Sequence, residues 1–164
     1  MDAFNPLEYF EMLAKKNKLC KQHGFKPVFC SGPDNIEGIM AEYRKTENFI
    51  VIFDTTDNNV HCSKPGWFTR SVYTVWVIAS TAYNDTDDRN EKLSLCRRIF
   101  NQFLSKMISD KAKRVYGEGM YYMNLDRILY KELGRYSFNG ATGLYFMVEN
   151  DVPTNLILQP EDWL

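Results

Sequence analysis

Five side chains of the kinds that ligate zinc or act as thiol nucleophiles and bases lie within the first 62 residues: Cys20, His23, Cys30, His61 and Cys62. Zinc sites use thiolates and imidazoles at compact spacings, but this spacing fits no such signature and contains no Cys-x-x-Cys pair. A cysteine nucleophile needs an adjacent base or a lowered pKa, and neighbours on a strand, as His61 and Cys62 would be, point to opposite faces. We therefore assign no catalytic residue and no cofactor. The five side chains remain candidates for an alternative function, a small intracellular enzyme or a metal- or ligand-binding domain that uses the His61-Cys62 loop.

Two groups of carboxylates could in principle hold Mg²⁺ for phosphoryl transfer. Asp54 and Asp57 follow one apolar run, and Asp85, Asp87 and Asp88 follow another. The second group is explained by its place at the start of a helix, and the first by an Asx-rich turn. The glycines of 117–119 lack the spacing of a phosphate-binding loop. The sequence therefore predicts no nucleotide or metal site here.

Aromatic residues make up 15% of the chain, more than two helices on a small sheet require. Aromatic side chains together with arginine mark protein interfaces, although a tyrosine-rich core is the alternative explanation. Stacking on single-stranded nucleic acid would also need a basic groove, and the formal net charge of −1 makes direct nucleic-acid binding unexpected. We predict an interface formed by the following residues: Asp57, Trp67, Phe68, Arg70, Tyr73 and Trp76.

The overall composition indicates one domain of 164 residues, with a tail from about residue 153 to 164. Hydrophobic residues make up 45% of the chain, enough for a sizeable core. No signal peptide is recognisable at the N-terminus, and no apolar run is long enough to span a bilayer. We therefore expect a soluble intracellular protein whose four cysteines are free thiols.

Two helices are predicted to pack on a sheet. Residues 85–113 carry apolar side chains at steps of three and four, with acidic residues first and basic residues last, which suits the helix dipole. Asp88 is the expected N-cap of this helix, with Glu91 three residues later. Residues 5–22 form the first helix, with Asn5 as N-cap, Pro6 at the first helical position and a stop at Gly24.

The strands are predicted from β-branched and aromatic runs. Residues 49–53 read as a strand covered on both faces, 70–83 as the longest strand, and 144–148 as the return from a hairpin at Asn139-Gly140, with Pro153 ending that stretch. Residues 125–133 fit a strand or a helix, and we favour the strand. Both faces of 70–83 are apolar, so a partner subunit or another layer of the same chain must cover the second face.

The remaining segments are predicted to be less regular. Residues 25–30 read as a short strand broken by Pro27, 31–35 as a turn, 36–43 as a short helix or strand, and 54–66 as a long polar connection. Together these elements predict an α+β fold, a mostly antiparallel sheet of about four strands with an N-terminal helix and one long amphipathic helix packed on it.

This element order resembles that of the small tail-terminator and head–tail connector (neck) proteins of tailed phages. The resemblance covers most of residues 5–150 and is carried by residues 49–53, the long strand 69–83, helix 88–110 and residues 143–148. Residues 24–47 and the tail after Pro153 have no counterpart. The resemblance implies a non-enzymatic, self-associating subunit, often a hexameric ring, in the virion or the host cytoplasm. Its implied partners are further copies of itself and other tail or head–tail proteins.

Overall fold

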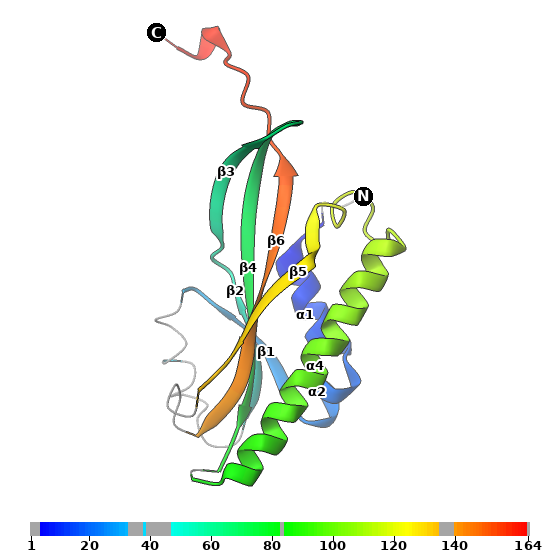
Figure 1. Ribbon diagram of the computed structural model, residues 1–164, viewed down its shortest axis with the longest axis vertical. Helices are drawn as coiled ribbons and strands as arrows, with labels where there is room; N and C mark the ends of the chain where they lie inside the picture. Colours follow the sequence, from blue (N-terminus) through cyan, green and yellow to red (C-terminus); the bar gives the residue numbers. More distant parts are fainter. Residues whose placement is uncertain (1–3, 33–37, 39–46, 83, 135–139, 164) are drawn as a thin grey trace.

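The computed structural model describes residues 4–32, 38, 47–82, 84–134 and 140–163. In these residues the chain is an α+β fold in which helices cover one face of a mixed sheet (Figure 1). The elements run in the order α1 (Pro6–Lys16), α2 (Lys18–Gln22), β1 (Phe25–Cys30), β2 (Asn48–Phe53), β3 (Asp57–Ser63), β4 (Gly66–Ser80), α4 (Thr86–Ala112), β5 (Met123–Glu132), β6 (Ala141–Pro153) and a 3₁₀ turn η1 (Pro160–Asp162). No helix among the described residues is both long and apolar enough to cross a membrane.

The sheet has six strands in the order β1-β2-β4-β6-β5, and β3 pairs with the first half of β4. The predicted α+β fold class is confirmed. The prediction of a mostly antiparallel sheet of about four strands matches the structure only roughly. β1 and β2 pair in parallel, while the other pairings are antiparallel. The strand predicted to be broken at Pro27 continues through it as β1. β1 is an edge strand, so the proline, which has no N–H, can face away from the neighbouring strand without loss of a hydrogen bond.

The strand β3 was missed because it lies in the segment read as a polar connection. Its sequence, DNNVHCS, has no apolar alternation, and most of its residues are exposed. β3 nevertheless pairs residue by residue with β4 from Asp57 opposite Val72 to Ser63 opposite Gly66. The long partner strand, rather than burial of its own side chains, therefore defines this strand. The predictions for 33–37, 39–46 and Asn139 lie outside the described residues.

The helix ends follow local side-chain chemistry. Asn5 caps α1 as predicted, since its Oδ1 accepts a hydrogen bond from the Leu7 N–H at 3.0 Å. The expected single helix 5–22 is interrupted at Asn17, which ends α1 and caps α2 by accepting from the Cys20 N–H at 2.9 Å. In α4 the N-cap is Asp85 rather than Asp88, because Asp85 accepts from the N–H groups of residues 87 and 88.

Asp88 binds the chain just before α4 instead of capping the helix. Its Oδ2 accepts a hydrogen bond from the Ala82 N–H at 2.8 Å and so joins the end of the β4 segment to the first turn of α4. The stripe predicted for α4 is otherwise buried against the sheet, except that Leu104 is half-buried and Ile108 is 54% exposed.

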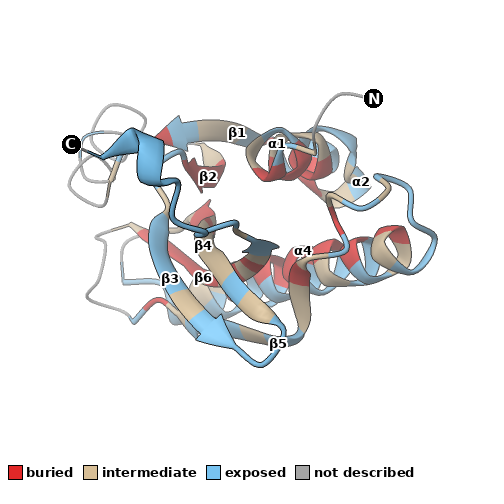
Figure 2. Ribbon diagram, turned by 90° about the horizontal axis from the view of Figure 1, so that it is seen from above, coloured by how far each residue is buried: buried red, intermediate tan, exposed pale blue. Residues whose placement is uncertain are grey.

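The core has two parts on opposite faces of the sheet. The larger lies between α1, α4 and the sheet, where buried residues line the facing surfaces (Figure 2). The smaller, on the other face, contains Phe49, Val51 and Phe53 of β2 with Ile78 of β4. β2 is therefore covered on both faces, as predicted. In the inner half of β4, Val75 and residues 77–79 are buried within the single chain, whereas no residue of the outer half is fully buried.

That outer half belongs to a projecting part of the sheet that we call the arm. The arm consists of β3, residues 66–73 of β4 and residues 148–153 of β6. It extends beyond the helices and leads into the C-terminal tail, residues 154–163 (Figure 1).

Candidate functional site

The six predicted interface residues lie on or near the arm, but on both of its faces. Because side chains alternate along a strand, Trp67 and Tyr73 of β4 face the helix side, whereas Phe68, Arg70 and Trp76 face the opposite side. Asp57 lies on β3 across from Val72 and is exposed. The structure therefore does not bring the six side chains into one surface.

Most of these side chains stabilise the arm itself. Arg70 donates two hydrogen bonds to Asp151 of β6, at 2.7 and 2.8 Å, and lies 3.4 Å from Glu149. This guanidinium holds the pKa of the Asp151 carboxyl below its usual range. Trp76 stacks on Tyr145 of β6 with ring centroids 4.9 Å apart. These contacts fasten β4 to β6, which leaves the two side chains poorly placed to reach another molecule.

Two further aromatic residues are partly engaged. Tyr73 packs near Phe10 of α1 with ring centroids 6.4 Å apart, and burial raises the pKa of its phenol. Phe68 stacks on His61 of β3, with ring centroids 5.8 Å apart. Trp67, in contrast, is 48% exposed. Of the predicted set, Trp67 is therefore the large apolar side chain most available for contact.

Trp67 belongs to an apolar surface that sequence reasoning did not assemble. Val60 of β3 and Val152 of β6 both pair with Thr69 of β4, so the three side chains lie on the same face of the sheet. Trp67 is two residues before Thr69 on β4 and therefore lies on that face as well. They are 52% and 43% exposed. We call Val60, Trp67 and Val152 the arm patch. Only strand pairing could reveal it, because Val152 is 85 residues beyond Trp67 in the sequence.

The tail begins beside this patch. Thr154 donates its N–H to the Trp67 carbonyl at 2.9 Å, and its hydroxyl is 2.6 Å from that of Thr69. Beyond this anchor the tail carries four large apolar side chains with exposed fractions of 52–74%: Leu156, Ile157, Leu158 and Trp163. The exposed apolar tail thus follows the arm patch directly along the chain.

The candidate zinc ligands and nucleophiles are dispersed. Cys20 lies in the larger core cluster, where burial raises the pKa of its thiol to about 12. Cys30 lies in the smaller cluster on the other face, and burial raises its pKa as well. His61 and Cys62 are neighbours on β3 and so point to opposite faces of the arm. Nowhere in the described ranges do three His, Cys, Asp or Glu side chains come together as a metal site.

His23, the remaining candidate, lines a cavity of about 230 Å³ beside α4. Its neighbours there include Glu91, Lys92 and Arg98, not a cysteine.

The two acidic groups that were considered as Mg²⁺ ligands also have structural uses. In the first group, Asp54 accepts a hydrogen bond from the Ser31 hydroxyl at 2.7 Å. In the second group, Asp85 and Asp88 accept hydrogen bonds from backbone N–H groups at and just before the start of α4.

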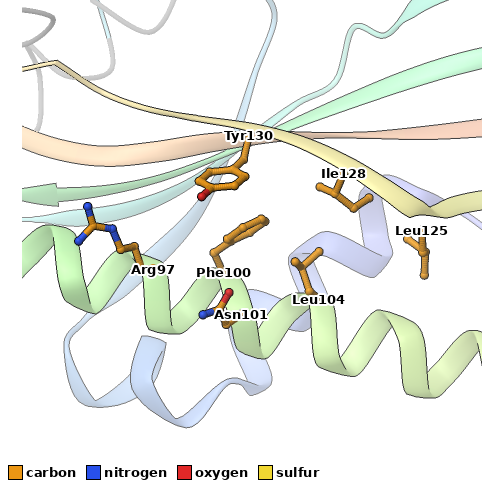
Figure 3. Close-up of a pocket in the computed structure, with 7 residues that line it drawn as sticks. All are labelled: Arg97, Phe100, Asn101, Leu104, Leu125, Ile128 and Tyr130. Carbon is orange, nitrogen blue, oxygen red and sulfur yellow. The ribbon is translucent and has the colours of Figure 1, made fainter.

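A second surface feature, the α4–β5 groove, was not predicted. It is a cavity of about 370 Å³ between the two elements (Figure 3), lined by Arg97, Phe100, Asn101, Leu104, Leu125, Ile128 and Tyr130. The register between β5 and β6 shifts here: from Asn124 to Leu129 β5 advances five residues while β6 advances two, from Glu149 to Met147. This irregularity belongs to an edge strand, where such bulges are frequent.

The groove combines apolar walls with a charged end. Phe100 and Tyr130 form one wall, with ring centroids 5.0 Å apart. Arg97 donates two hydrogen bonds to Glu132, at 2.6 and 2.9 Å, and this pair keeps the pKa of the Glu132 carboxyl low. The sequence showed the apolar spacing of Leu104 with its neighbours, but not that β5 would leave this side of α4 open.

A buried polar contact ties α1 to the end of α4. Asp110 is 2% exposed and accepts a hydrogen bond from the Tyr9 hydroxyl at 2.9 Å and another from Lys106. Burial and this carboxylate raise the pKa of Tyr9 far above its ordinary value. Tyr9 also contacts Phe4, with ring centroids 5.6 Å apart. The aspartate was missed because charge at a helix end is normally solvated.

No family model, no curated protein and no solved structure matches this chain.

Proposed function

We propose that this protein is a non-enzymatic structural subunit that acts by self-association and docking, of the kind found in phage tail terminators and necks. Its partners are further copies of the chain, arranged as a ring such as a hexamer, and other tail or head–tail proteins. The observation that carries the proposal is the arm, whose exposed apolar patch continues into an exposed apolar tail.

The physical argument concerns the cost of exposing apolar surface. Scattered apolar side chains are ordinary on a protein surface, but contiguous ones mark sites of association. The arm patch brings Val60, Trp67 and Val152 together on one face, and the tail adds four more large apolar residues. Tryptophan is enriched among the residues that dominate binding energy. A projecting arm and tail can reach a neighbouring subunit without rearrangement of the domain.

The first test is the mass in solution, measured by light scattering over a concentration series. A hexamer of 19.2 kDa chains has six times that mass, about 115 kDa. A closed oligomer of defined mass agrees with the proposal. A chain that stays monomeric at every concentration contradicts the self-association on which it rests.

A matched pair of variants locates the contact. Trp67→Ala removes the largest side chain of the arm patch, so we expect the concentration at which half of the chains are associated to rise about tenfold or more. Val115→Ala is the control, because Val115 is similarly exposed, at 55%, but lies beyond α4 rather than on the arm. Equal association of both variants and the wild type would show that the arm patch is not an interface.

A further inference from the structure

We propose that the C-terminal tail of one copy packs its leucine and isoleucine side chains into the α4–β5 groove of a second copy, with the acidic end of the tail against the basic surface of α4. This inference rests on the proposed function, because it names a contact through which copies associate.

The tail supplies the inserting side chains. Leu156, Ile157 and Leu158 are consecutive and are 52%, 74% and 64% exposed. Beyond Thr154, the tail hydrogen bonds described in the structure are local, such as Ile157 N–H to Asn155 Oδ1 at 3.0 Å. The backbone before η1 has no regular secondary structure. This segment therefore has large apolar surface to bury and few native contacts to give up on binding.

The groove supplies a matching surface. Its walls are the half-buried side chains of Leu104, Leu125 and Ile128, together with Phe100 and Tyr130 (Figure 3). In the described chain β5 pairs only with β6, so its other side carries no strand. Ile108, 54% exposed, is one helical turn beyond Leu104 and extends the apolar stripe along α4. An extended apolar segment fits along such an open groove.

Chain geometry places the Phe100–Tyr130 end of the groove beyond the reach of the chain's own tail, which favours a tail from another copy. The tail starts at Thr154, beside Trp67, whereas Phe146 is opposite Val75 and next to Tyr130. Eight residues of β6 separate Phe146 from Thr154, which is roughly 27 Å at about 3.4 Å per residue. Leu158 is four residues beyond Thr154 and reaches at most about 14 Å. The apolar part of the tail cannot reach the Phe100–Tyr130 wall of its own groove.

Charge complementarity favours one direction for the tail. Residues 152–164 contain two acidic residues, Glu161 and Asp162, and no lysine or arginine. Residues 92–112 of α4 contain five basic residues and one acidic residue, a net charge of +4. Three of these basic residues, Lys92, Arg97 and Arg98, precede Leu104, and Arg97 is also bound by Glu132. With Leu156–Leu158 beside Leu104, the acidic pair extends toward this end of α4. Exposed charges of this kind act over about a Debye length and are weakened by salt.

The test uses a fluorescein-labelled peptide of residues 154–163 and the full chain carrying Leu156→Ser, Ile157→Ser and Leu158→Ser, which leaves the groove free of its own tails. We expect saturable binding by fluorescence anisotropy that weakens as salt rises. Adding Asn101→Trp, which fills the groove from an exposed position, should lower the affinity at least about tenfold. Ser105→Trp, an exposed α4 position that does not line the groove, is the matched control.

Light scattering on the same proteins separates this inference from the proposed function. If the wild type associates and the triple-serine variant does not, and the peptide binds, the tail–groove contact is supported. If the triple-serine variant associates like the wild type and the peptide does not bind, this inference is overturned while self-association stands. If the wild type is monomeric throughout and the peptide does not bind, both are overturned.

Discussion

Replacing Gly143 by alanine tests the alignment of the two central strands, β4 and β6. Both the arm patch and the α4–β5 groove depend on this alignment. Gly143 lies in β6 opposite Ile78 of β4 and has φ +155°. A Cβ built at this position would be 1.9 Å from the carbonyl oxygen of Val77 and 3.1 Å from the Ile78 Cα. These are backbone atoms of a central strand, so no side-chain rotation can relieve the overlap.

The magnitude has two parts. A non-glycine residue in a disfavoured backbone conformation costs about 1–3 kcal/mol, and overpacking of a well-packed interior costs about 1–3 kcal/mol more. We expect Gly143→Ala to lower the free energy of unfolding by roughly 4 kcal/mol. For a chain of this length each 1 kcal/mol shifts Tm by about 2–4 °C, so the expected fall is roughly 8–16 °C.

The assay is urea unfolding followed by circular dichroism, with thermal unfolding in parallel. Gly117→Ala is the control, because Gly117 also has a positive φ, +60°, but a Cβ there meets nothing within 4 Å. It should lose only the backbone part, about 1–2 kcal/mol. A larger loss in Gly143→Ala than in Gly117→Ala therefore reports the steric overlap between β4 and β6 together with the more extreme backbone conformation at Gly143.

A Gly143→Ala protein as stable as Gly117→Ala would refute the reasoning. It would mean that β4 and β6 do not approach in this register at Val77. The pairing that places Val152 on the same face as Trp67 would then lose its basis, and with it the arm patch.

Three further outcomes are expected. Tyr9→Phe removes the hydroxyl that donates to buried Asp110, so we expect a loss of about 1.5–3 kcal/mol in urea unfolding; an unchanged midpoint would contradict this contact. Burial raises the pKa of the Cys20 and Cys96 thiols from 9.0 to about 12, and that of Tyr9 above 10.0. Above pH 9 the unfolded chain therefore binds fewer protons than the folded chain, and the unfolding free energy, measured in urea at pH 7–10.5, should fall as pH rises. A thiol reagent should modify Cys62 rapidly in the native protein, because it is the exposed one of the four cysteines, and all four only after denaturation.

The elements that local sequence predicts are those whose signals lie within a few residues. The Asn5-Pro6 start of α1, the doubly buried β2 and the apolar stripe of α4 depend on capping, β-branched runs and helical spacing. Residues 125–132 were correctly read as a strand, although their spacing also fitted a helix. The errors at Asn17 and Asp85 are of the same local kind, since several nearby side chains could serve as caps.

Contacts between distant residues could not be predicted in the same way. β3 is a strand only because β4 lies beside it, and the parallel pairing of β1 with β2 leaves no mark in either sequence. Arg70 was chosen as an interface residue, yet its partner Asp151 is 81 residues away and keeps it within the arm. The arm patch and the α4–β5 groove likewise join residues from separate elements.

By itself the sequence determined the α+β class, the two main helices and most strand positions, because hydrophobic periodicity and capping act locally. Only the tertiary structure decided which apolar side chains remain exposed. That choice depends on strand register, where a shift of one residue moves every side chain to the other face. It places Trp67 beside Val60 and Val152, and it leaves one side of α4 open along β5.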